Sequence, residues 1–389
     1  MGTLQRLSEI WVALRGVTRS GSLGPQAPRR LGAAVDWTRR AQLVTHDGGI
    51  SKGYSLLRGH WASSYPETTG YTIPTLLRAA DSQQDPVLRE MALSLAEYLL
   101  GCMTMDGGAA HWASPNSSPV VFDTGQVMFG WLSAFDASTD DRYLRAAVRA
   151  GDWLVSVQDD SGMWAEHQHL GVAKVIDTRV AWALLELSCR TGRGPYRRAA
   201  VRNLEWALGH QDADGWFRQC AFAPGQDPFT HTIAYTAEGL LECGCLLDDV
   251  RYREAARLTA DALLARQCRD GRLASTYGPR WQATSRSTCL TGNCQVALLW
   301  LRLYGLLGQR QYLDAARKAV AYVASTQHVD AESPNTRGAI AGSYPIWGRY
   351  ERLQYPNWAA KFFIDALLAL QEAQDLCNVR PHRATSFPG

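Results

Sequence analysis

The sequence predicts an all-α protein in which six helical hairpins close into one ring, an (α/α)6 toroid. One observation is a unit of roughly 55 residues that recurs six times along the chain. The others are that each unit pairs an amphipathic helix with an apolar helix, and that long aromatic-rich loops gather on one side. Such a unit cannot bury both helices alone and must stack on its neighbours. An open solenoid of the HEAT type is the alternative, although its repeats are nearer 40 to 47 residues and would lack these loops.

The amphipathic helices are expected on the outside of the ring. Four of them open with a tyrosine before a run rich in arginine and alanine. Five end in a glutamine, and the first five are followed by an aspartate and a glycine that turn the chain through a positive φ. The sixth exit, after Gln327, lacks the glycine and is degenerate. The expected ranges are 31–42, 86–103, 143–158, 196–211, 252–267 and 312–327.

The apolar helices are expected to form the inside of the ring, and a polar cluster stands before each of them. Their N-terminal ends all lie on the side of the long loops, so their free N–H groups should line one mouth. Polar side chains at these starts are therefore expected to share a cleft. The apolar runs are 71–77, 121–132, 180–187, 233–241, 295–303 and 358–370.

Composition excludes several classes of protein. The chain of 389 residues is 46% hydrophobic, which is ample for a large core, and its net charge of +3 without long Lys/Arg runs argues against a nucleic-acid partner. Nine scattered cysteines predict reduced thiols and a cytoplasmic location. We find no signal-peptide pattern and no apolar run long enough for a transmembrane segment. We expect a flexible lead-in over residues 1–30, one toroid domain over 31–375 and a tail over 376–389.

Four residues are candidates for catalysis. Asp123 and Asp177 begin the second and third inner helices in similar contexts, Phe-Asp-Thr-Gly and Ile-Asp-Thr-Arg. Two carboxylates on adjacent helices can act as acid and base at one glycosidic bond, whereas the alternative is that each only caps its helix. His231 and Tyr235 share one helix face and can abstract a proton from a sugar carbon, as in lyases and epimerases. A hydrogen-bonded core pair is the alternative for these two.

Candidate substrate-binding residues lie in the loops and at the helix starts. Aromatic rings stack on sugar faces, and Arg349 or Lys361 can hold a carboxylate. The loops of the first and last units should meet when the ring closes. The candidates are His60, Trp61, Tyr65, Glu67, Trp112, Gln126, His167, Arg179, Asn293, Tyr344, Trp347, Arg349, Tyr350, Asn357, Trp358 and Lys361.

We expect no metal or other cofactor. His167 and His169 have metal-ligand spacing but no placed third ligand. Cys289 and Cys294 flank a helix start in a way that invites comparison with zinc toroids, yet a matching histidine motif is missing. Asp140-Asp141 is similar to an Asp-rich terpene-cyclase motif but occupies an ordinary connector, so we interpret it as a solvated turn.

With Asp123 and Asp177 at the starts of inner helices two and three, the six-unit pattern resembles the (α/α)6 carbohydrate-active proteins, especially unsaturated glucuronyl hydrolases. This resemblance implies that Asp177 is the acid/base and Asp123 its partner. Segments 65–71 and 355–363 also look like signatures of uncharacterised toroid proteins encoded in bacterial exopolysaccharide clusters, which implies a pathway rather than a reaction.

The leading hypothesis is a glycoside hydrolase-like enzyme that acts on a uronic-acid-containing oligo- or polysaccharide through Asp123 and Asp177. A lyase or C5-epimerase is the second, with His231, Tyr235 and a base near His60. A third is a non-catalytic toroid that binds glycan or the polysaccharide assembly machinery. A fourth, a terpene-cyclase-like protein, is suggested by the Gln-x-x-Asp-Gly-Trp pattern of residues 211–216.

Overall fold

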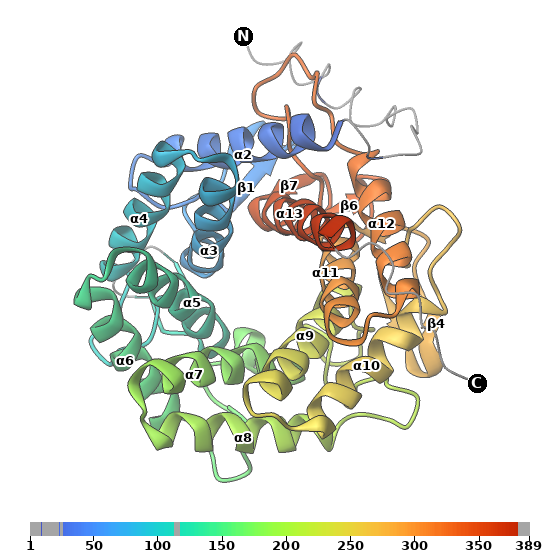
Figure 1. The fold of residues 1–389 in the computed structure, drawn as a ribbon. Helices are drawn as coiled ribbons and strands as arrows, with labels where there is room; N and C mark the ends of the chain where they lie inside the picture. The colour runs from blue at the N-terminus through green and yellow to red at the C-terminus, as the bar shows by residue number, and fades with distance from the viewer. Residues whose placement is uncertain (1–8, 10–22, 24–25, 113–116, 380–389) are drawn as a thin grey trace.

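The computed structural model describes residues 9, 23, 26–112 and 117–379. Twelve helices of this part of the chain form two concentric rings, which confirms the (α/α)6 toroid (Figure 1). The outer ring consists of α2 (Ala27–Leu43), α4 (Pro86–Leu100), α6 (Asp141–Ser156), α8 (Gly194–Leu208), α10 (Val250–Leu264) and α12 (Arg310–Ala324). The inner ring consists of α3 (Pro66–Gln83), α5 (Val121–Ser138), α7 (Thr178–Thr191), α9 (Thr230–Leu246), α11 (Leu290–Leu307) and α13 (Asn357–Val379).

The ring closes through its first and last helices. Each inner helix contacts the next one, and α13 contacts α3. The outer helix α2 packs against α13, so the N-terminal helix completes the hairpin of the C-terminal one. Most of the expected lead-in and the tail beyond 379 lie outside the described residues, but Glu9 is buried and accepts a hydrogen bond from the Tyr54 hydroxyl at 2.8 Å.

The repeated glutamine and glycine tie neighbouring outer helices together. Gln158 Nε2 donates to the carbonyl of Gly162 and to that of Ala199 on α8, both at 2.9 Å. Gly162 has φ +90°, and a Cβ there would lie 2.4 Å from the Arg202 carbonyl oxygen, so only glycine fits. Gln211 and Gln267 make the equivalent bonds to Ala255 and Ala315. The Gln-x-x-Asp-Gly-Trp pattern that suggested a terpene cyclase is thus accounted for by packing between units.

The sixth exit uses the same interaction to close the ring. Gln327 Nε2 donates to the Arg30 carbonyl at 3.1 Å and to the Gly338 carbonyl at 2.9 Å. Gly338 has φ +82°, and a Cβ there would meet the Ala33 carbonyl oxygen at 2.0 Å. The glycine that seemed to be missing therefore lies farther along the chain, after a longer turn.

We expect Gln327→Leu to lower the free energy of unfolding by about 2 kcal/mol, because it leaves two buried carbonyl groups without their donor. Urea denaturation measures this loss. Gln311→Leu, on the exposed side of α12, is the matched control and should change stability by less than about 0.5 kcal/mol. Equal stability of the two variants would contradict a role for Gln327 in closing the ring.

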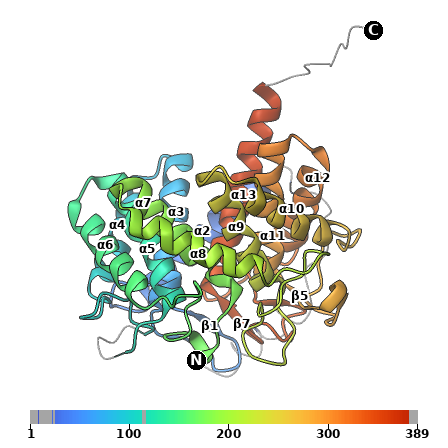
Figure 2. The same cartoon turned by 90° about the horizontal axis from the view of Figure 1, so that it is seen from below.

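Short strands join the loops at one end of the ring. Strand β1 (Gly53–Ser55) pairs with β2 (His60–Trp61) and with β7 (Gln354–Pro356), so the first and last loops meet as expected. Strand β5 (Thr288–Cys289) pairs with β6 (Ser343–Tyr344), and β3 (Tyr277–Gly278) pairs with β4 (Gln282–Ala283). Figure 2 shows β1, β5 and β7 at the end opposite to the one where α13 protrudes.

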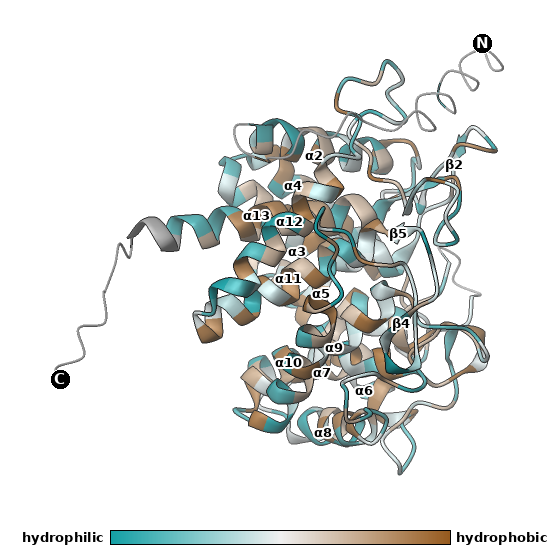
Figure 3. Ribbon diagram, turned by 90° about the vertical axis from the view of Figure 1, so that its right-hand side faces the viewer, coloured by the Kyte–Doolittle hydropathy of each residue, from teal (hydrophilic) through white to brown (hydrophobic). Residues whose placement is uncertain are grey.

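The core lies between the two rings and is rich in large aromatic side chains. Trp37, Trp131, Trp164 and Trp300 are completely buried. Figure 3 shows helices that carry both apolar and polar stretches, in keeping with one buried and one solvated side for the outer ring. Among the described residues, no helix is both long enough and apolar enough to cross a membrane. All eight cysteines whose side chains are described are free thiols.

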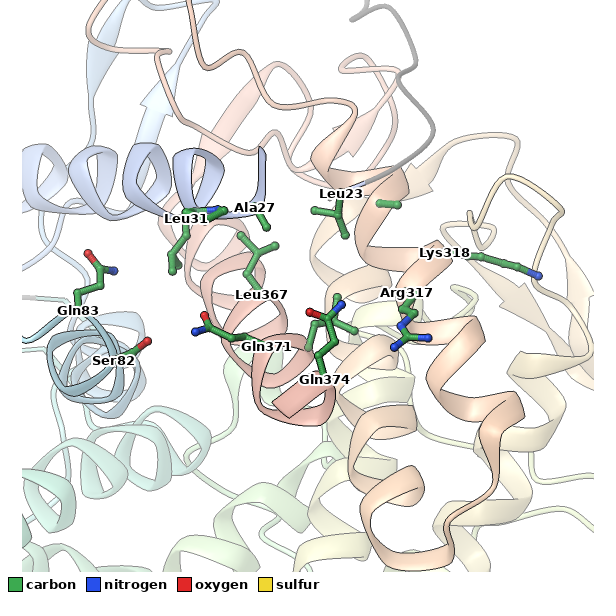
Figure 4. A pocket seen from close by; sticks show the side chains of 13 residues that line it. Leu23, Ala27, Leu31, Ser82, Gln83, Arg317, Lys318, Leu367, Gln371 and Gln374 are labelled. Atoms are coloured by element: carbon green, nitrogen blue, oxygen red, sulfur yellow. The ribbon is translucent and has the colours of Figure 1, made fainter. Parts of the chain in front are cut away.

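A groove of about 810 Å3 lies between α2, α3, α12 and α13 (Figure 4). Leu31 and Leu367 give it apolar walls, and Gln371 and Gln374 project from the protruding part of α13. None of the candidate site residues lines this groove.

Candidate active site

A second cavity, of about 360 Å3, lies at the mouth where the inner helices begin and the loops meet. Helices α3, α5, α9 and α13 contribute side chains from their first two turns, and the connecting segments supply the rest. Its volume is at the lower end of the roughly 300 to 1,000 Å3 typical of ligand pockets. The expectation that the polar helix starts share one cleft is confirmed for these four helices.

Eight of the candidate residues line this cavity. They are Tyr65, Glu67, Trp112, Asp123, His231, Tyr235, Tyr350 and Trp358. Asp177 does not line it, although its neighbour Ile176 does. The remaining candidates fall into three groups outside the cavity.

The first group lies deeper in the ring. Arg179 forms a buried ion pair with Glu238, donates to Gln126 Oε1 at 3.0 Å, and lies 4.7 Å from the centroid of the Tyr235 ring. Lys361 Nζ is 2.8 Å from a carboxylate oxygen of Asp365. Arg179 and Lys361 line a separate cavity of about 310 Å3, which lies farther along the inner helices, away from their N-terminal ends. This first group, made of Gln126, Arg179 and Lys361, therefore packs beneath the residues that line the candidate site.

The second group anchors the helix starts. Asn293 Nδ2 donates to the Ala319 carbonyl at 2.9 Å, and Asn357 Nδ2 donates to the Ser51 carbonyl at 2.8 Å. The carbonyl of His167 accepts from the Val121 amide at 2.9 Å. These side chains and this carbonyl hold the backbone around the cavity.

The third group lies on or near the surface of the loops. His60, Trp347 and Arg349 are exposed, and Tyr344 packs edge-on against Tyr322. Trp61 packs against Trp37 and donates to Asn335 Oδ1 at 3.1 Å. The carboxylate-binding role expected for Arg349 and Lys361 thus has no support from the position of either side chain.

Several lining residues are not among the candidate catalytic or substrate-binding residues. They are Lys52, His111, Gln168, His169, Lys174, Phe222 and Glu351. All come from loops that do not repeat between units, so only their proximity in space reveals them. Among the described residues, no group of three or more His, Cys, Asp or Glu side chains is placed to hold a metal ion.

Asp123 is buried in the first turn of α5 at the cavity wall. One of its carboxylate oxygens lies 2.6 Å from His111 Nδ1. The N-cap position of α5 is Val120, so Asp123 lies inside the first turn and does not occupy the capping position. Burial raises the pKa of Asp123, and the neighbouring His111 opposes that rise. Asp123 is therefore an acid in a low-dielectric site, with His111 as its side-chain partner.

Glu67 lies in the first turn of α3 on the same cavity. Burial raises the pKa of Glu67 to about 8, and the charge of Asp123 raises it further, whereas Tyr65 and Lys52 act in the opposite direction. Glu67 consequently carries a proton at neutral pH. A protonated acid beside a carboxylate that is stabilised by a histidine is the arrangement that acid/base chemistry needs.

Asp177 occupies the N-cap position of α7, but its side chain makes no capping hydrogen bond. Its Oδ2 accepts from Gln168 Nε2 at 2.7 Å, while Oδ1 has no hydrogen-bond partner among the described residues. Burial raises the pKa of Asp177 to about 7, and Lys174 and Gln168 oppose this rise. Gln168 lines the cavity and Asp177 does not, so the hydrogen bond from Gln168 connects this carboxyl group to the cavity wall.

His231 contacts Gln295 Oε1 through Nδ1 at 2.6 Å, so Nδ1 is the donor. Burial lowers the pKa of His231 to about 3. Its ring lies 4.3 Å from that of Tyr235, whose pKa burial raises. A neutral histidine with so low a pKa is a weak base, and a tyrosine with a raised pKa is a weak acid. This pair is poorly suited to abstracting a proton from carbon.

Lys52 supplies a positive charge to the cavity. Its Nζ is 5.7 Å from the centroid of the Trp358 ring and 6.0 Å from that of Tyr65. The Glu351 carboxylate is 4.0 Å from the ammonium, and burial raises the pKa of Glu351. A cation framed by aromatic rings can hold a ligand that is both ring-shaped and acidic.

No protein-family model and no curated protein sequence matches this chain. Solved structures do match. The unsaturated glucuronyl hydrolase of Bacillus sp. GL1, described as responsible for glycosaminoglycan degradation, is 17% identical with a TM-score of 0.69 over 89% of this chain and 97% of that one. An unsaturated glucuronyl hydrolase specific for heparin is 14% identical with a TM-score of 0.70, over 90% of this chain and 98% of that one.

A third match is a variant unsaturated glucuronyl hydrolase from Streptococcus agalactiae, solved as a complex with dGlcA-GalNAc6S. It is 12% identical with a TM-score of 0.68, over 92% of this chain and 97% of that one. The three likenesses confirm the fold and the architectural resemblance that the sequence indicated. At these identities they establish the fold alone.

Proposed function

We propose that the protein is a glycoside hydrolase-like enzyme that acts on an acidic oligosaccharide in the cavity of about 360 Å3. One observation carries this proposal. Glu67, Asp123 and Asp177 begin three consecutive inner helices at one mouth of the ring, and burial raises the pKa of each. Acids with raised pKa values at a cleft are typical of catalytic acid/base groups.

In this proposal Asp123 acts as the base. It takes a proton from a water molecule, which attacks the sugar, and His111 stabilises its ionised form. Glu67 is protonated at neutral pH and donates to the leaving oxygen, so the two lining acids complete the reaction. Asp177, which the resemblance favours as acid/base, has a pKa of about 7 and can take the place of Glu67 once Gln168 moves aside. Comparing Glu67→Gln with Asp177→Asn decides between these donors.

The walls of the cavity support a sugar substrate. Trp112, Tyr65, Trp358 and Tyr350 present aromatic rings to a space that is small for a long chain, which favours binding of a chain end. Lys52 is suited to bind the carboxylate of a uronic acid residue. Two of the structural neighbours were solved together with saccharides that begin with dGlcA.

A product assay tests the proposal directly. The protein is incubated with oligosaccharides that end in a saturated uronic acid, in a 4,5-unsaturated uronic acid, or in a neutral sugar, and mass spectrometry detects cleavage. Cleavage of an acidic substrate with uptake of one water is the expected result. Binding of such a ligand without any product would instead support the non-catalytic toroid.

A lyase or an epimerase would give a different result. A lyase product carries a new 4,5-double bond, and an epimerase exchanges the hydrogen at C5 with deuterium from the solvent. We expect neither, because of the weak basicity of His231. His60, the other base of that hypothesis, is exposed and does not line the cavity.

We expect Lys52→Met to raise the KM for an acidic oligosaccharide by about 10- to 100-fold, the loss of one charge-assisted hydrogen bond. The KM for the same sugar with its carboxyl group reduced to an alcohol should stay within about twofold. Steady-state kinetics with the two substrates measures this difference. An equal rise in KM for both would mean that Lys52 shapes the cavity without recognising charge.

The wider setting remains a proposal as well. We propose that the protein is cytoplasmic, takes part in exopolysaccharide metabolism and associates with the polysaccharide assembly machinery. The sequence signatures at 65–71 and 355–363 support this link. Cell fractionation and co-purification with assembly proteins would test it, and recovery in the external medium would contradict it.

A further inference from the structure

Residues 168–174 form one wall of the active-site cavity. Gln168, His169, Leu170 and Lys174 all line it. The short 3-10 helix η2 (His169–Gly171) lies within this segment, and a second, η3 (Val175–Asp177), follows directly and leads into α7. Leu170 has φ +61° and a side chain that is 61% exposed, so the segment covers the cavity without being packed into the core.

Lys174 holds this segment in place from inside. Its side chain is 1% exposed, and Nζ donates to the carbonyl of His169 at 2.6 Å and to that of Val172 at 2.7 Å. One ammonium group thus ties together two points of the same loop. A buried cation needs an opposite charge nearby, because its loss of hydration is costly.

Asp177 supplies that charge. Burial lowers the pKa of Lys174, and the negative charge of Asp177 opposes this effect. His169 is the other titratable group of the segment, and burial, together with the charges of His111, Lys174 and Lys52, lowers its pKa. At the other end of the segment, Gln168 donates to Asp177 at 2.7 Å. Gln168, at one end of the wall, is therefore hydrogen-bonded to Asp177, and Lys174, at the other end, lies in the electric field of the Asp177 carboxylate.

We propose that Lys174 is a positioning residue that holds residues 168–173 over the cavity while Asp177 is ionised, and that protonation of Asp177 loosens this wall. The coupling rests on the hydrogen bonds of Lys174 within the segment, on the Gln168–Asp177 bond, and on the turn in which the Asp177 amide donates to the Lys174 carbonyl at 3.2 Å. Its consequence for turnover rests on the proposed function, since a wall that opens when Asp177 gains a proton would admit substrate or release product.

Hydrogen exchange followed by mass spectrometry tests the coupling without any substrate. In the unmodified protein, protection of the peptide covering 168–174, corrected for the intrinsic exchange rate, should rise several-fold between about pH 5.5 and about pH 8 as Asp177 ionises. In Lys174→Met this protection should fall by about tenfold at the upper pH and lose its pH dependence. Lys318→Met, on the outer helix α12, should behave like the unmodified protein. Unchanged protection in Lys174→Met would overturn the proposal.

Asp177→Asn provides a second variant in case Lys174→Met does not fold. It keeps a side chain that Gln168 can still contact but removes the charge, so the segment should exchange at both pH values as the unmodified protein does at the lower one. Protection that keeps its dependence on pH in Asp177→Asn would also overturn the coupling. If the wall responds as expected but no oligosaccharide is cleaved, the proposed function fails and the coupling stands.

In kinetics, Lys174→Met should move the pH profile of kcat/KM. Lys174 holds the pKa of Asp177 below the value that burial alone would impose. Without the ammonium group, the limb of the profile that reports Asp177 should shift to higher pH. A structural role for Lys174 alone would lower activity equally at every pH.

Discussion

Replacing Asp123 by asparagine is expected to lower kcat by about 10²- to 10⁴-fold, the range for loss of one general acid or base. Asparagine has nearly the same shape and can still accept a hydrogen bond from His111, so the cavity should keep its form. What it cannot do is take a proton from water. Turnover of the acidic oligosaccharide, measured beside the circular dichroism spectrum and the melting temperature, gives the result.

Asp140→Asn is the matched control. Asp140 is the N-cap residue of α6 and its side chain accepts from the Arg142 amide, a capping role that asparagine fills equally well. We expect its kcat to stay within about twofold of the original. A similar kcat for Asp123→Asn would remove Asp123 from the reaction and leave Glu67 and Asp177 as the acids to be explained.

The ring could be predicted from the sequence because its units repeat and because the two helix types differ in hydrophobic pattern. The closing interaction was harder to find. Gln327 keeps the repeated glutamine, but its glycine lies at position 338, at the far side of an irregular turn. A sequence pattern is recognised by the fixed spacing of its residues. The Ala33 carbonyl requires only that a glycine pack against it in space, wherever that glycine stands in the chain.

The site could be predicted where side chains project from the first turns of the inner helices. Glu67, Asp123 and Trp358 lie there and line the cavity. Lys361 is three residues beyond Trp358, so the rise of an α-helix places it about 4.5 Å deeper, facing the opposite half of the ring. Polar residues at a helix start are thus divided between the two cavities according to their depth along the axis.

The loop residues could not be predicted in this way. Lys52 precedes β1, whose position is set by pairing with the distant strand β7, and His111 lies in an irregular loop before α5. Their roles in the candidate site are recognised only from the structure, which places His111 beside Asp123 and Lys52 beside Trp358. Local sequence carries no record of such partners.

We expect the free energy of unfolding to be higher at low pH, because the folded protein stabilises the protonated form of Glu67. In the unfolded chain a glutamate loses its proton near pH 4.3, whereas the folded protein holds the Glu67 pKa at about 8. The folded state therefore binds this proton more tightly. Its stabilising contribution is complete below the unfolded pKa and is lost progressively as the pH rises through the folded pKa. The protonated Glu67 that the proposed reaction would use thus makes the protein less stable at neutral and alkaline pH.

Glu67→Gln removes this dependence, since glutamine does not titrate. We expect the variant to have nearly the original stability at about pH 4 and to exceed it by about 2 kcal/mol or more at about pH 8.5, because each unit of pKa shift corresponds to about 1.4 kcal/mol. Urea denaturation at the two pH values measures the difference. Glu90→Gln, on the exposed side of α4, should show no such divergence. A Glu67→Gln variant that gains nothing at the higher pH would mean that Glu67 is already ionised at neutral pH, and that the proton for the leaving group must come from Asp177.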